Sequence, residues 1–135
     1  MAKETPKKST KKIVKKRSKT PVFSGSIFVQ SSFNNTIISI TDETGNVIAW
    51  ATSGSSGFKG ARKSTPYAAQ IAAAAAIEKA KARGFCKAKV YVTGVGSGRE
   101  SAVRAITNTD IQVTLIKDTT PVAHNGCRPK KARRV

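Results

Sequence analysis

The chain has 135 residues, a mass of 14.3 kDa and a formal net charge of +18, with 25 Lys and Arg residues against seven Asp and Glu residues. This length suits one compact domain, and the sequence has neither an apolar stretch of membrane-spanning length nor the hydrophobic region of a secretory signal. We therefore expect a polyanionic partner and no membrane partner.

The first segment, residues 1–22, is predicted to be a disordered basic arm. Its first twenty residues hold nine Lys or Arg residues and one acid, Glu4. Such a run repels itself and has too few apolar residues to fold alone, so a polyanion would have to neutralise it. The alternative is a tail that only keeps the protein soluble. From the arm onward we expect an α/β RNA-binding core over residues 23–120.

Three apolar and β-branched runs open this core and predict an antiparallel meander, with strands over residues 26–33, 36–42 and 47–52. Asn34 and Asn35 are expected to form the first turn, since asparagine tolerates positive φ. Residues 43–46, with the sequence ETGN, are expected to form the second turn.

The loop after the meander contains GFKGARKST, residues 57–65, in which glycines, cations and hydroxyls are close together. It resembles a phosphate-binding P-loop, but Arg62 stands where the second glycine of that motif is required. A nucleotide site is therefore disfavoured. Lys59, Arg62 and Lys63 are better explained as donors to the phosphates of a nucleic acid.

Helix and strand signals alternate over the rest of the core. Ser64 or Thr65 caps a predicted helix that has Pro66 at its first position and ends at Gly84. Its alanine run allows close approach to a sheet, with Tyr67, Ile71 and Ile77 as larger packing groups. The elements that follow are a strand over 87–94, a helix over 99–108 and a strand over 111–121. The order βββαβαβ predicts a mixed sheet covered by helices.

A second glycine-rich turn, GVGSGRES at residues 94–101, joins a strand to a helix but lacks the spacing of a dinucleotide-binding motif. One reading is that its N–H groups and Arg99 face a phosphate at the helix start. In the other reading the glycines serve only the turn, and Arg104 pairs with Glu100 at the i, i+4 spacing. We favour phosphate contact for Arg99 and leave Arg104 open.

Catalytic and metal sites have little support. The acids fall in turns or beside strands, without the spacing that acid–base or metal chemistry needs. His124, Cys127 and Cys86 supply three candidate ligands, whereas a structural zinc site uses four. We predict a protein that is not an enzyme and has no cofactor, metal or small-molecule substrate, with reduced cysteines.

The last segment, residues 121–135, is predicted to be a second disordered basic arm, with five Lys or Arg residues and no acid after residue 123. Within it, Asn125 precedes Gly126, and this pair favours closure of a succinimide and conversion to isoaspartate. The alternative is a turn that uses the pair only for positive φ.

Several long motifs resemble one known family. They are FNNTIISITD at 33–42, GNVIAWATSG at 45–54, GFKGARKSTPYAAQ at 57–70, GRESAVRA at 98–105, and the ending TPVAHNGCRPKKARRV. In these motifs the chain resembles the eleventh protein of the ribosomal small subunit, in its bacterial or organellar form. The resemblance covers nearly everything after residue 24. The GVGSG turn, the alanine run and the Lys-rich start depart from the family pattern or have no fixed pattern in it.

The resemblance implies a ribonuclease H-like core in the small subunit, located on its platform. Members of this family bridge separate helices of ribosomal RNA, contact neighbouring platform proteins, and help form the cleft near the messenger exit that holds the Shine–Dalgarno duplex. The location implied is a cytoplasmic ribosome, or an organellar one. The implied RNA-binding residues are Asn34, Asn35, Lys59, Arg62, Lys63, Arg99, Asn125, Arg128, Lys130, Lys131, Arg133 and Arg134.

Two other functions remain as alternatives. A general nucleic-acid compaction protein would rely on basic arms without a fixed site, whereas cations in ordered loops favour a specific RNA site. A nucleotide-binding enzyme would respond to nucleotide titration.

Overall fold

The computed structural model describes residues 20–135. The elements are β1 (Ser24–Ser31), β2 (Thr36–Asp42), β3 (Val47–Thr52), the 3-10 helix η1 (Gly60–Ser64), α1 (Pro66–Lys81), β4 (Lys87–Gly94), α2 (Gly98–Thr107) and β5 (Gln112–Asp118). The predicted order βββαβαβ is confirmed, with η1 as an addition. The prediction of a disordered arm over residues 1–22 falls on residues of which 1–19 lie outside the described part.

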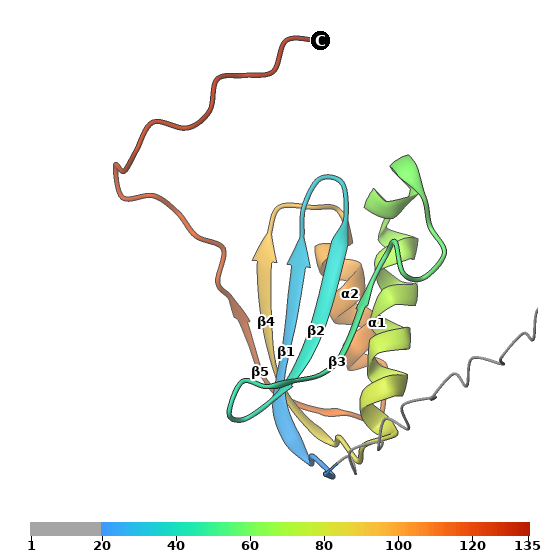
Figure 1. Ribbon diagram of the computed structural model, residues 1–135. Helices are drawn as coiled ribbons and strands as arrows, with labels where there is room; N and C mark the ends of the chain where they lie inside the picture. The colour runs from blue at the N-terminus through green and yellow to red at the C-terminus, as the bar shows by residue number, and fades with distance from the viewer. Residues whose placement is uncertain (1–19) are drawn as a thin grey trace, which may run out of the picture.

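One five-stranded sheet organises the molecule, in the order β3-β2-β1-β4-β5. The first three strands form the expected antiparallel meander, while β4 and β5 run parallel to β1. Both helices lie together on one side of this sheet (Figure 1). The mixed sheet confirms the ribonuclease H-like class, and within residues 20–135 no helix covers the other side of the sheet.

The core forms where α1 meets the sheet, and its composition explains the alanine run. Seven residues of α1 are buried, and six of them are alanines: Ala68, Ala69, Ala72, Ala73, Ala76 and Ala80, with Ile77 as the seventh. Small side chains bring the helix close to strand residues such as Ile27, Ile38 and Ile40, which are fully buried. Ile77 packs as predicted, but Tyr67 does not, because it is 62% exposed and meets Phe58 edge to face at a centroid distance of 5.9 Å.

The ends of α1 follow the capping signals. Thr65 is the N-cap, and its hydroxyl accepts a hydrogen bond from the Ala68 N–H at 3.3 Å. Pro66 occupies the first helical position, where a missing N–H costs nothing. The helix ends at Lys81, earlier than predicted, and Gly84 follows with a φ of 83° that allows the chain to turn toward β4.

No helix among residues 20–135 has the length and the apolar character needed to cross a membrane.

Candidate nucleic-acid interface

Three loops that are distant in sequence meet at one end of the sheet. They are the β1–β2 turn, the segment with η1, and the β4–α2 turn (Figure 1). The Gly96 N–H donates to the Ser31 carbonyl at 3.1 Å, which joins the third loop to β1. The Ser97 hydroxyl donates to the Ser64 carbonyl at 2.5 Å, which joins it to η1. Predicted RNA-binding residues of all three loops are thereby brought to one end.

The β1–β2 turn presents asparagines as predicted, but for a different reason. The Ser32 N–H donates to the Asn35 carbonyl at 2.9 Å, and the Asn35 side-chain oxygen accepts from the Thr36 N–H at 2.9 Å. Asn125 is the one described non-glycine residue with positive φ, so the expectation of positive φ at Asn34 or Asn35 is wrong. Asn35 orders the turn through its side chain, while Asn34 is exposed.

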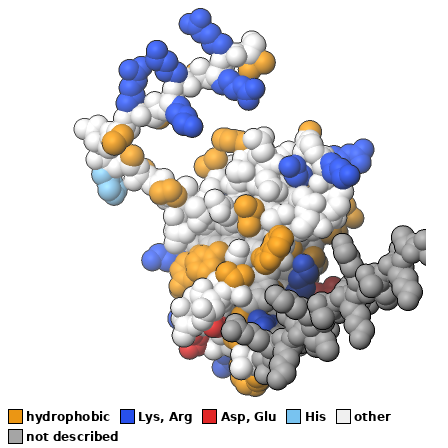
Figure 2. Space-filling view, viewed as in Figure 1, with side chains coloured by type: hydrophobic (Ala, Val, Ile, Leu, Met, Phe, Trp, Pro, Cys, Tyr) orange, Lys and Arg blue, Asp and Glu red, His pale blue; other side chains and the backbone are white. Residues whose placement is uncertain are grey.

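The segment with η1 carries the three cations of the loop 57–65, which are Lys59, Arg62 and Lys63. Lys59 and Arg62 are exposed, and Lys63 is half-buried, with its aliphatic chain near Gly54. Figure 2 shows Lys and Arg side chains grouped over this end of the molecule. Among the described residues none of these three cations takes part in an ion pair. They are therefore available to phosphates without first breaking an internal salt bridge.

The glycines of the β4–α2 turn are explained by close packing. A Cβ on Gly94 would lie 2.0 Å from the Ser31 carbonyl oxygen, and one on Gly96 would lie 2.2 Å from that of Ser32. Gly98 sits equally tightly against α1, where an added Cβ would be 2.7 Å from that of Ala69. The N–H groups of Gly94 and Gly96 already have protein acceptors. The structural reading of these glycines is thus favoured over a phosphate cradle.

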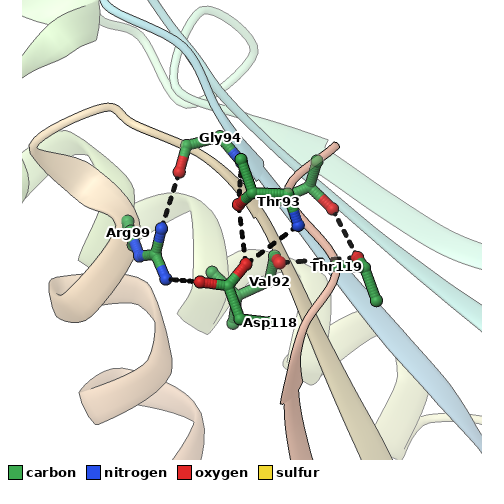
Figure 3. A network of polar contacts seen from close by, with 7 residues as sticks. Val92, Thr93, Gly94, Arg99, Asp118 and Thr119 are labelled. Atoms are coloured by element: carbon green, nitrogen blue, oxygen red, sulfur yellow. Dashed lines mark hydrogen bonds and ion pairs between the residues drawn. The ribbon is translucent and has the colours of Figure 1, made fainter. Parts of the chain in front are cut away.

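Arg99 lies at the start of α2 and turns toward the sheet (Figure 3). Its guanidinium donates to the Gly94 carbonyl at 2.8 Å and pairs with the Asp118 carboxylate at the end of β5. The hydroxyl and the N–H of Thr120, followed by Arg99, lower the pKa of Asp118 to about 2. Contact of Arg99 with RNA stays a prediction. Its side chain is 33% exposed, so any phosphate would have to share the guanidinium with Asp118.

Asp118 is the residue of this network that the sequence did not reveal. It lies 19 positions after Arg99, and its placement depends on the parallel pairing of β4 with β5. For Arg104, the sequence allows either a phosphate contact or a pair with Glu100. Its guanidinium lies 3.6 Å from the Glu100 carboxylate, and both side chains are highly exposed.

The C-terminal tail leaves the core after β5, at the same end as the three loops (Figure 1). Residues 121–135 are exposed throughout and carry the predicted cations Arg128, Lys130, Lys131, Arg133 and Arg134 away from the core (Figure 2). Asn125 has a φ of 60°, which agrees with a turn at this position. The structure does not bring the tail residues together with the loop residues into a single compact site.

Sequence comparisons with known proteins identify relatives of this chain. The model of the family described as Ribosomal protein S11 matches residues 25–134. The chain is similar to the small ribosomal subunit protein uS11 of Desulfovibrio desulfuricans, with 56% identity over 93% of this chain and 97% of that protein. It is 53% identical to uS11 of Solibacter usitatus and 56% identical to uS11 of Cellvibrio japonicus, in both cases over the full length of each chain.

Proposed function

Because the chain belongs to the ribosomal protein S11 family, and is thus a structural, non-enzymatic protein of the small ribosomal subunit, we propose that it binds ribosomal RNA through the loop end of its sheet. Its location is the ribosome, which we propose to be a cytoplasmic one. The contacts proposed are those of Asn34, Asn35, Lys59, Arg62, Lys63 and Arg99, together with Asn125, Arg128, Lys130, Lys131, Arg133 and Arg134 of the tail.

The observation that carries this proposal is the fixed position of η1 beside the β4–α2 turn. Lys59 and Arg62 are exposed on a segment that hydrogen bonds tie to α2 and α1. Cations held in an ordered loop lose less conformational entropy when they bind than cations on a flexible arm. This arrangement suits one defined RNA site better than the unspecific binding expected of a compaction protein.

The mechanism proposed is architectural. Cations of the loops meet phosphates and release counterions, and the rigid core keeps the contact points at constant separations. The basic arms reach RNA segments farther from the core. A protein of this kind holds separate RNA helices in a fixed relative arrangement, chiefly through shape and backbone contacts.

The finer location follows from the family resemblance and is part of the proposal. On this view the protein sits on the platform, bridges several RNA helices, contacts neighbouring platform proteins, and helps form the messenger-exit cleft beside the Shine–Dalgarno duplex. The arms 1–22 and 121–135 serve as RNA-binding extensions of the core 23–120.

Co-sedimentation of the tagged protein with small ribosomal subunits in high salt tests the proposal. We expect the protein to stay with the subunit at salt concentrations that remove loosely bound polycations. Crosslinking within the retained particles should then join the loop residues to ribosomal RNA of the platform. Release of the protein together with unspecific polycations would contradict a fixed site.

A further inference from the structure

The side of the sheet that faces away from α1 and α2 carries a row of side chains that crosses all five strands. The strand registers place Trp50 of β3 beside Ser39 of β2, Ser39 beside Phe28 of β1, Phe28 beside Tyr91 of β4, and Tyr91 beside Lys117 of β5. Phe28 is 43% exposed and Trp50 is 55% exposed. The loops described above do not use this row, which we call the aromatic row.

The two aromatic rings at the centre of the row stack on each other. The centroids of Phe28 and Tyr91 lie 5.3 Å apart, with an interplanar angle of 16°. At the β3 edge, the Lys79 ammonium lies 5.8 Å from the centroid of the Trp50 ring and donates to the Trp50 carbonyl. Half-exposed rings on a sheet are a surface on which flat aromatic groups stack.

The surroundings of the aromatic row are polar and cationic. A depression of about 480 Å³ lies next to Tyr91, and its lining includes the lysines Lys87 and Lys89 and the hydroxyls of Ser26 and Thr114. Glu43 also lines it, with one carboxylate oxygen accepting a hydrogen bond from Ser24 at 2.5 Å. Figure 2 shows hydrophobic side chains gathered on this face with Lys or Arg side chains at their margin. The face therefore offers a partner for each part of a nucleotide: rings for the base, hydrogen-bonding groups for the base edge and sugar, and lysines for the phosphate.

We propose that the aromatic row is a platform for unpaired RNA nucleotides, whose bases stack on Phe28, Tyr91 and Trp50 while Lys89 and Lys117 meet the phosphates. This inference rests on the proposed RNA-binding role and adds the class of RNA that the protein recognises. Paired RNA keeps its base faces inside the helix, so it offers the rings nothing on which to stack. Unpaired nucleotides of loops and bulges present both their faces and their edges.

Two other occupants fit the face less well. A second copy of this chain brings a net charge of +18 and would be repelled. An apolar segment of another protein would need a continuous aliphatic patch, but the exposed aliphatic residues Ile37 and Leu115 lie on β2 and β5, with β1 and β4 between them. The side chains between them are aromatic, polar or cationic.

The sole tryptophan of the chain, Trp50, reports binding directly. In 0.3 M salt, where contacts of the basic arms are weakened, we expect a short unstructured oligoadenylate to quench Trp50 fluorescence in the full-length protein. Phe28→Leu and Tyr91→Leu keep apolar volume but remove the ring faces. Each should weaken binding about 5- to 150-fold, the loss expected when one base loses its aromatic partner. Phe23→Leu is the matched control, since Phe23 is 66% exposed and lies outside the row.

The outcomes separate this inference from the proposed function. Wild-type protein that binds neither oligoadenylate nor ribosomal RNA would overturn both. Wild-type protein that binds RNA with the same affinity as the two leucine variants would overturn the platform alone. Inorganic polyphosphate, which has phosphates but no bases, should bind all variants equally. In assembled small subunits, crosslinks from the aromatic row should lead to RNA, and crosslinks only to a neighbouring protein would also overturn the inference.

Discussion

Arg99 of α2 is paired with Asp118 at the end of β5, so the arginine that the sequence places at a phosphate site is also a structural tie between a helix and an edge strand (Figure 3). Two hydrogen bonds also connect Asp118 to Thr120, which lies just before the tail. The N–H and the hydroxyl of Thr120 both donate to the same carboxylate oxygen of Asp118. The network thus holds the point at which the C-terminal tail leaves the core.

This network predicts a dependence on pH. The pKa of Asp118 is lowered to about 2 by Thr120 and Arg99, compared with an ordinary value of 3.8. A carboxyl group with a lowered pKa stabilises the folded state above its ordinary pKa, and that contribution is lost as the pH falls through its folded value. We expect the stability that this tie contributes to be full above about pH 4 and to decline toward pH 2, where the Asp118 carboxylate itself takes up its proton. NMR titration of the Asp118 carboxyl carbon measures this directly.

The matched variant for that measurement is Asp118→Asn, which removes the titrating group and keeps its size. Its amide signals at Thr119 and Thr120 should be insensitive to pH in the window where those of the wild type move. A pKa near 4 for Asp118 in the wild-type protein would mean that the contacts of Arg99 and Thr120 with its carboxylate do not persist in solution.

The β4–α2 turn predicts a marked difference between two glycine substitutions. Gly94 and Gly45 have similar φ angles, 101° and 94°, but a Cβ on Gly94 would strike the Ser31 carbonyl while none on Gly45 meets an atom within 4 Å. Gly45→Ala should lower the free energy of unfolding by about 1–2 kcal/mol, the cost of the left-handed conformation. Gly94→Ala adds a steric clash and should cost about 4 kcal/mol or more. Urea unfolding of both variants gives the comparison, and equal losses would mean that the turn relaxes freely.

The strand and helix order was predictable because each element has a local signal. The alternation of the meander, Pro66 at the start of α1 and the alanine run all act within a few residues. The structural roles of individual residues were harder to predict from the sequence. Asn35 orders its turn with its side chain instead of by positive φ, and Tyr67 lies outside the core because α1 meets the sheet through alanines.

Contacts between distant segments set the limit of prediction for the candidate site. The cations of η1 were visible as a motif, and the structure leaves Arg62 exposed and Lys63 half-buried. The partner of Arg99 was not visible, because Asp118 reaches it only after β5 has paired with β4. The aromatic row was equally hidden, since Phe28 and Tyr91 lie on adjacent strands but are 63 residues apart in the chain.

Deletion of residues 1–19 should change the salt dependence of RNA binding more than its specificity. This segment holds nine Lys or Arg residues and one acid, and each phosphate that it neutralises releases counterions. We expect the slope of log K against log salt for small-subunit RNA to become shallower by about 0.7–0.9 per lost phosphate contact. Filter binding at several salt concentrations measures the slope. An unchanged slope would show that the arm does not contact RNA.

The loop 57–65 should affect the affinity for one RNA site more than the salt dependence, because η1 orders its cations before RNA arrives. Arg62→Ala combined with Lys63→Ala should weaken binding to the platform RNA by about 1.5–3 kcal/mol for each charge-assisted hydrogen bond lost. The matched control is Lys81→Ala combined with Arg104→Ala, which removes the same charge from two surface ion pairs outside both the loop and the aromatic row. Since exposed charges contribute little to stability, both double variants should unfold near the wild-type urea concentration. Isothermal titration with a platform RNA fragment then separates a lost site from a lost charge: equal weakening by the two pairs would mean that net charge alone binds RNA, whereas weakening confined to the loop pair assigns the site to η1.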